Sequence, residues 1–80
     1  MPVILRYKGY TFFFFSNEVN LREPLHVHVR RAEVTAKFWI KPQVGAAESY
    51  GLSSQELNEF AKVVVDNRQL IERAWHEFFG

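Results

Sequence analysis

The first part of the chain alternates apolar and polar residues in short runs, which is the pattern of β-strands. Residues 3–7 and 10–15 are rich in β-branched and aromatic side chains and flank Lys8-Gly9, a two-residue connection suited to a tight hairpin turn. Pairing across this turn predicts a core face of Val3, Leu5, Tyr7, Tyr10, Phe12 and Phe14, and an opposite face of Ile4, Arg6, Thr11, Phe13 and Phe15.

A second hairpin is predicted over residues 26–31 and 35–41, with its turn near Ala32-Glu33. Its natural register pairs His26 with Trp39, and strand alternation then separates two chemically different faces. One face is apolar and consists of Val27, Val29, Ala36, Phe38 and Ile40. The other is cationic and aromatic and consists of His26, His28, Arg30, Thr35, Lys37, Trp39 and Lys41.

The last third of the chain changes to helical spacing. Residues 43–51 indicate a loop or a short edge segment, and residues 53–56, Ser-Ser-Gln-Glu, form a capping-box pattern that starts a helix. The apolar residues of 57–78 keep one helical phase across the polar residues 66–68, which favours a single long helix over two helices joined by a turn. The sequence therefore predicts an α+β domain in which an antiparallel sheet of about four strands, two hairpins, packs one face against a long C-terminal helix.

Charge follows the same division. Residues 1–42 carry seven Lys or Arg against three Glu, which is +4, and residues 43–80 carry three against six acidic residues, which is −3. We therefore predict one domain over residues 1–80, with a β-rich basic half at 1–42 and an acidic helix at 52–79. A domain of 80 residues has a thin core, so a partner protein or a second copy of the chain is expected to cover part of it.

Several classes of protein do not fit the composition. The chain has no cysteine, which excludes a disulfide scaffold and a thiolate zinc site. Its longest unbroken apolar run, residues 12–15, is too short to cross a bilayer, and the N-terminus does not have the pattern of a secretory leader. We expect a cytoplasmic protein with no membrane partner.

The His26-Val27-His28 motif is the strongest hint of chemistry. Histidines two residues apart on a strand point the same way, so they can form an acid and base pair or share a metal ion. Catalytic zinc usually takes three protein ligands, and Glu23 or His76 supplies a third only if the fold brings it close. We assign no metal and no cofactor, and the alternative favoured over both chemistries is that the histidines lie on a wet or partner-covered face.

The cationic and aromatic face is a candidate binding surface. Basic side chains can contact phosphates, and aromatic rings can stack on nucleic acid bases, as in sheet-based RNA binders. The rival interpretation, which we favour, is that the helix, a second copy or another protein covers the aromatic rings. The candidate surface consists of Arg30, Lys37, Trp39, Lys41, Phe13 and Phe15.

Motifs along nearly the whole chain resemble those of one family. They are Pro2-Val3-Ile4-Leu5-Arg6, the run from Gly9-Tyr10-Thr11 through Phe12-Phe13-Phe14-Phe15 to Ser16-Asn17-Glu18, then Glu23-Pro24-Leu25-His26-Val27-His28-Val29, Ala36-Lys37-Phe38-Trp39-Ile40, Tyr50-Gly51-Leu52-Ser53, Asn67-Arg68 and Ala74-Trp75-His76-Glu77-Phe78-Phe79-Gly80. In these segments the sequence resembles the small bacterial family catalogued as domain of unknown function 4160. Members commonly have two prolines before the first histidine, whereas Leu25 takes the second place here.

The resemblance implies a short bacterial cytoplasmic protein, often encoded beside a second small protein of unknown function (family 2442) in a suspected toxin and antitoxin pair. We therefore expect a protein-interaction module of such a two-gene system, whose polar sheet face and part of whose helix dock a small partner protein. The alternatives are a small ribonuclease and a non-catalytic RNA-binding sheet. In the ribonuclease, His26 and His28 are the acid and base, while Arg30 and Lys37 hold phosphate.

Overall fold

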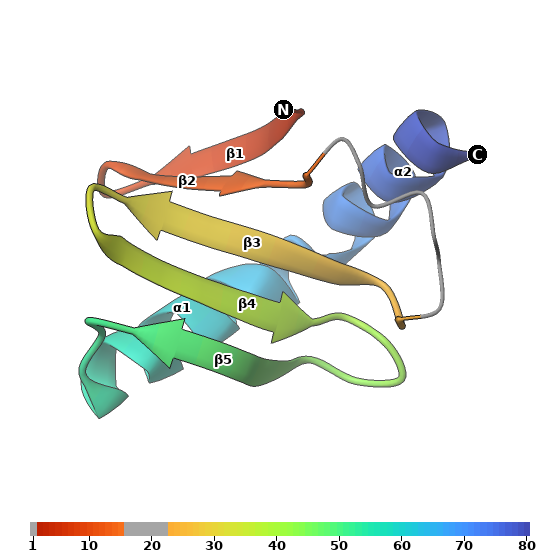
Figure 1. Ribbon diagram of the computed structural model, residues 1–80. Helices are drawn as coiled ribbons and strands as arrows, with labels where there is room; N and C mark the ends of the chain where they lie inside the picture. Colours follow the sequence, from red (N-terminus) through yellow and green to blue (C-terminus); the bar gives the residue numbers. More distant parts are fainter. Residues whose placement is uncertain (1, 16–22) are drawn as a thin grey trace.

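The computed structural model describes residues 2–15 and 23–80. One antiparallel sheet has five strands in chain order, and both helices lie on the same side of it (Figure 1). The α+β class and the helix-covered antiparallel sheet are therefore confirmed. The elements are β1 (Val3–Tyr7), β2 (Tyr10–Phe13), β3 (His26–Arg31), β4 (Val34–Trp39), β5 (Gly45–Tyr50), α1 (Ser54–Asp66) and α2 (Arg68–Phe79).

The first hairpin follows the predicted register except at its start. Lys8 and Gly9 both have positive φ, 51° and 81°, which suits a tight turn between twisted strands. The pairing is irregular between Val3 and Leu5, and one extra residue in a strand reverses the direction of the side chains beyond it. The predicted core position of Val3 is therefore wrong: its side chain is 40% exposed, and Ile4 packs against the core instead.

The second hairpin has the predicted register along its whole length, with His26 opposite Trp39 and Arg31 opposite Val34. Its turn is at Ala32-Glu33, where Ala32 has a φ of 53°. The fourth strand ends at Trp39, two residues earlier than predicted. Residues 16–24, whose polar composition and closing Pro24 indicate a loop, lie outside the described part of the chain apart from Glu23 and Pro24.

A fifth strand lies where the sequence indicates a loop or a short edge segment. Residues 45–50 pair antiparallel with β4, so that Thr35 lies opposite Tyr50 and Lys37 opposite Glu48. Glycine and alanine at the start of this segment have weak strand preference, which explains why the pattern alone does not identify it. The sheet therefore has one more edge strand than the two predicted hairpins supply.

The helical region begins as predicted but is not one helix. The Ser53 hydroxyl accepts a hydrogen bond from the Glu56 amide at 3.1 Å, and the Glu56 carboxylate accepts one from the Ser53 amide at 3.0 Å. The predicted single long helix is wrong, because α1 ends at Asp66 and α2 begins at Arg68. Asn67 interrupts the helix at φ −111° and donates from its side chain to the Val63 carbonyl at 2.8 Å, a local bond that competes with helical geometry.

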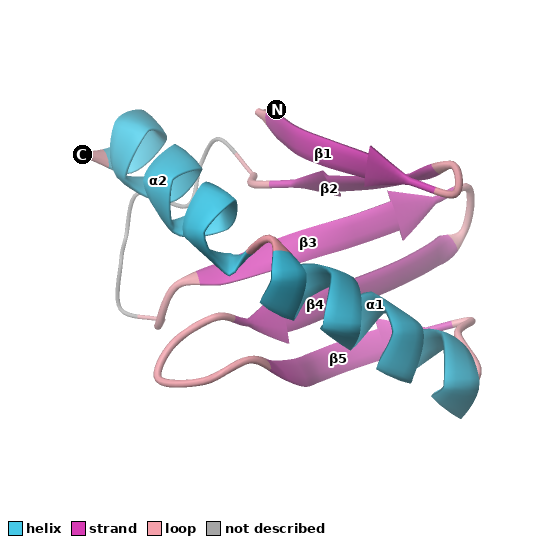
Figure 2. Ribbon diagram, turned by 180° about the vertical axis from the view of Figure 1, so that it is seen from behind, coloured by secondary structure: helices cyan, strands magenta, loops and turns pink. Residues whose placement is uncertain are grey.

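The core lies between the helices and the apolar sheet face. From the side opposite to Figure 1, α1 crosses β4 and β5, while α2 lies toward the ends of the strands (Figure 2). Phe60 of α1 meets the rings of Tyr7, Tyr10 and Phe12 at centroid distances of 6.0, 4.6 and 6.2 Å. The buried cluster consists of Tyr10, Phe12, Phe14, Leu25, Val27, Val29, Ala36, Phe38, Ile40, Phe60, Val64, Ile71 and Trp75.

Two ion-pair clusters fix the helices to the sheet. The Glu59 carboxylate accepts from the Tyr7 hydroxyl at 2.6 Å and lies 2.7 Å from Lys8 Nζ, which joins the first hairpin to α1. Glu72 of α2 lies 3.1 Å from Lys41 Nζ and 3.2 Å from Arg68 Nε. Within the described residues, no helix is long and apolar enough to span a membrane.

Candidate functional site

The helices cover one face of the sheet (Figure 1). The other face carries two rows of side chains that run across all five strands. Cross-strand pairing sets both rows, since opposed residues in an antiparallel sheet share a face. The first row is Arg6, Thr11, Arg30, Thr35 and Tyr50. The second is Val3, Phe13, His28, Lys37 and Glu48. We call this surface the open face.

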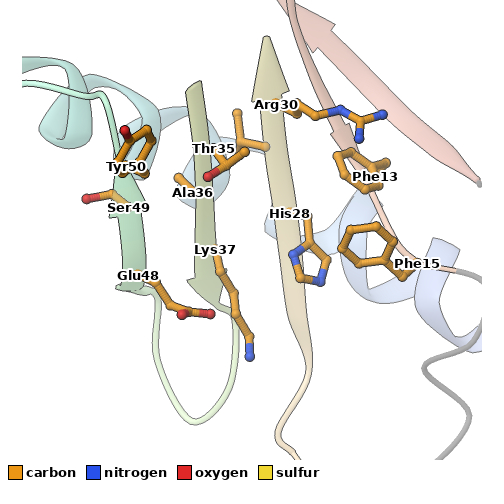
Figure 3. A pocket seen from close by; sticks show the side chains of 11 residues that line it. Phe13, Phe15, His28, Arg30, Thr35, Ala36, Lys37, Glu48, Ser49 and Tyr50 are labelled. Atoms are coloured by element: carbon orange, nitrogen blue, oxygen red, sulfur yellow. The ribbon is translucent and has the colours of Figure 1, made fainter. Parts of the chain in front are cut away.

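A groove of about 400 Å³ lies on the open face. Figure 3 shows one wall formed by side chains from β2 and β3 and the segment after β2, and the other by Glu48 and Tyr50 of β5, with Thr35 of β4 between them. Because Thr35 is short, the groove runs over β4 between taller neighbours. Five of the eight predicted site residues line it: Phe13, Phe15, His28, Arg30 and Lys37.

The first wall is an aromatic cluster. The His28 ring stacks on Phe13 at a centroid distance of 5.6 Å and meets the edge of Phe15 at 4.5 Å. The Arg30 guanidinium lies 5.2 Å from the centre of the Phe13 ring, within cation–π range. Phe13 is buried, whereas Phe15 is 40% exposed and presents an apolar surface to the groove.

Lys37 lies at one end of the groove and forms an ion pair with Glu23. Its Nζ is 2.7 and 3.2 Å from the two carboxylate oxygens of Glu23 and 4.7 Å from the centre of the Trp39 ring. The Lys37 side chain is only 12% exposed. Its charge is therefore neutralised within the molecule rather than presented to a phosphate.

His26 has a different environment from His28. Its side chain is 2% exposed, and its Nδ1 donates to the Pro24 carbonyl at 2.9 Å. The His26 ring lies 5.5 Å from Trp75 of α2 and 5.8 Å from Trp39, and its Nε2 is 3.9 Å from a Glu23 oxygen. A molecule in the groove therefore reaches His28 but not His26.

The remaining two predicted site residues lie outside the groove. Trp39 and Lys41 line a second hollow of about 310 Å³, together with Pro24 and the connection between β4 and β5. Lys41 comes after the end of β4, so strand alternation does not set its direction, and its ammonium group pairs with Glu72 of α2. The structure thus divides the predicted surface among the groove, the second hollow and the buried His26.

Sequence reasoning missed the wall formed by β5. The side chains of Glu48 and Tyr50 lie on the open face and line the groove. Tyr50 is the most exposed large hydrophobic residue described, at 72%. The available signal was the spacing of two between Glu48 and Tyr50, too short a pattern to distinguish a strand from a loop. Within the described residues, no three His, Asp or Glu side chains group as a metal site would.

Comparison with known proteins identifies one matching family. A family model described as a domain of unknown function (DUF4160) matches residues 9–76, a stretch that includes the groove and most of both helices. Neither the curated proteins nor the solved structures contain a match to this chain.

Proposed function

The chain belongs to the family described as a domain of unknown function (DUF4160), and from its groove we propose that it is a protein-interaction module that binds a small partner protein through the open face. The observation that carries this proposal is an exposed aromatic surface surrounded by charges of both signs. Phe15 and Tyr50 offer apolar contact on opposite walls, with Arg30 on the same wall as Phe15 and Glu48 on the same wall as Tyr50. Protein interfaces favour aromatic residues and arginine at the centre of the contact.

The charges of this surface favour a protein partner over RNA. Binding to nucleic acid relies on cations that neutralise phosphates. Lys37 is paired with Glu23, Lys41 is paired with Glu72, and Glu48 adds a negative charge to the groove wall. These carboxylates would repel a phosphate backbone, whereas a protein segment can match charges of both signs.

The burial of His26 weakens support for a ribonuclease. Acid and base catalysis requires both groups to reach the same substrate within hydrogen-bond distance, directly or through one water. Only His28 lines the groove, and the Nδ1 of His26 is used in a bond to the Pro24 carbonyl. Binding without catalysis therefore fits the described residues better.

The family also suggests where to look for the partner. Its members are often encoded beside a second small protein, and we propose that this neighbour is the partner, in a bacterial, cytoplasmic system of the toxin and antitoxin type.

Co-expression with the adjacent gene product tests the proposal. We expect a complex that survives gel filtration at micromolar concentration, and Phe15→Ala and Tyr50→Ala should each weaken it at least about tenfold, as expected for aromatic residues at the centre of an interface. Phe78→Ala is the control, because Phe78 is an exposed aromatic residue of α2, 46% accessible, outside the groove.

Two proteins that elute separately, or groove variants that bind as well as the parent, would contradict the proposal. Binding of RNA oligonucleotides that weakens steeply with salt, in the absence of a protein complex, would favour the RNA-binding alternative.

A further inference from the structure

The two edges of the sheet differ in how well they are protected against further pairing. The β1 edge follows Pro2, is irregular between Val3 and Leu5, and carries Arg6 and the nearby Lys8. Proline, bulges and basic side chains are devices by which proteins keep a sheet edge from pairing with another strand. The first edge is therefore blocked in several ways.

The β5 edge has fewer of these devices. Residues 45–50 contain no proline and no basic residue, and within the described part of the chain no strand lies beyond them. Their pairing with β4 is irregular only near Phe38 and Ala46, while Glu48, Ser49 and Tyr50 pair regularly. This regular, exposed end of β5 is also a wall of the groove.

The surroundings of this edge are acidic. Glu48 has no ion-pair partner among the described residues, although it lies opposite Lys37, whose ammonium group turns to Glu23. The helix α1 packs against β5, and residues 43–66, which span both, carry Lys62 against Glu48, Glu56, Glu59 and Asp66. With Lys8 paired to Glu59, the net charge of this region is −2. A basic segment is therefore attracted to this edge and an acidic one is repelled.

We propose that the partner supplies an extended basic segment that adds to the sheet as a sixth strand along β5. Main-chain hydrogen bonds to β5 provide affinity, and side chains on the open-face side provide selectivity: a basic one beside Glu48 and an apolar one against Tyr50. The inference rests on the proposed function and specifies the chemistry of its partner. A second copy pairing antiparallel through the middle of β5 would bring two Glu48 carboxylates close together, which is unfavourable, so the occupant is a foreign segment.

The test uses the full chain labelled with ¹⁵N and an acetylated, amidated hexapeptide of sequence Thr-Lys-Thr-Val-Thr-Lys, in which the lysines and the valine share one strand face. Amide hydrogen exchange measured by NMR should slow at alternate amides of residues 45–50 and remain unchanged in residues 3–7. Glu48→Lys should weaken peptide binding by about threefold to tenfold, since an exposed ion pair is replaced by repulsion. Glu77→Lys, the same change at an exposed position of α2, should not weaken it, and a peptide with glutamate in place of lysine should bind less well.

Three results would overturn the inference: no slowing of exchange in β5, slowing in β1 instead, or equal affinity for the parent and Glu48→Lys. The adjacent gene product, examined in the same way, separates this inference from the proposed function. If the partner binds but the β5 amides stay unprotected, strand addition is contradicted, whereas the proposed function as an interaction module is retained. If the gene product does not bind, the proposed function is contradicted. The peptide experiment then still shows whether β5 accepts an added strand.

Discussion

At the scale of single residues, the Glu59 carboxylate joins two elements that are far apart in the sequence. Lys8, through its hydrogen bond, and then Tyr7 lower the pKa of Glu59 below its ordinary value of 4.5. The same contacts, with Glu59 as the first cause, raise the pKa values of Lys8 and Tyr7. All three protonation states found at neutral pH are therefore favoured in the folded molecule.

A pH dependence of stability follows from Glu59. Because its folded pKa is lower than its unfolded pKa, its contribution to the free energy of unfolding is fully present above the unfolded value near 4.5 and is lost as pH falls through the folded value. Urea unfolding at pH 7 and pH 3 should show a smaller acid loss for Glu59→Gln than for the parent. The exposed Glu77→Gln serves as the control, and identical acid losses in all three proteins would contradict the assignment.

For His26 and His28, the sequence predicts the sheet face of both side chains but not their accessibility. Strand alternation correctly places His26 and His28 on one face, because the register of their hairpin is set by a two-residue turn. Alternation does not predict what covers the end of a strand. Trp75 lies 49 positions after His26, and its contact with that ring depends on how the second helix packs. The accessibility of His26 could therefore not be predicted locally.

At the scale of elements, the features that depend on neighbouring residues were predictable and the others were not. The capping box lies within four residues and was predicted correctly. The break at Asn67 was not, because the apolar residues keep their helical phase and the Ile71 amide still bonds the Asn67 carbonyl at 2.9 Å. Likewise, β5 becomes a strand by pairing with β4, which its own composition only weakly indicates.

The start of α1 provides a test at this scale. Ser53→Ala removes the hydroxyl that accepts from the Glu56 amide and should lower the free energy of unfolding by about 0.5–2 kcal/mol. Ser54→Ala is a matched control, since Ser54 is the first residue of the helix and its side chain makes no hydrogen bond within the described residues. Chemical denaturation measures both, and equal losses would show that the cap does not stabilise the helix.

At the scale of the whole molecule, α2 completes the core. Ile71 is fully buried, and Trp75 packs against Phe14 at a ring distance of 5.1 Å and against Phe79 at 4.4 Å. An 80-residue domain has only a small free energy of unfolding. Losing the burial of several side chains therefore costs more free energy than the fold has to spare.

We therefore expect a chain that ends at Asn67 to lose cooperative unfolding. Thermal melts followed by circular dichroism should show no sharp transition, and the dispersed amide signals of the parent should collapse. Phe78→Ala in the full chain should keep a sharp transition, because Phe78 is largely exposed. A truncated chain that still melts cooperatively would show that the sheet and α1 form a sufficient core without α2.

The order of the strands has a consequence for how the chain forms on the ribosome. Each strand pairs with the one synthesised just before it, so the sheet can grow in step with translation without waiting for distant sequence. The helices differ, because α1 packs on the first hairpin through Phe60 and α2 contacts β1, so both join late elements to early ones. Until the final residues emerge, the Trp75 side chain does not yet cover Phe14. The nascent protein therefore exposes an apolar, aggregation-prone surface at one end.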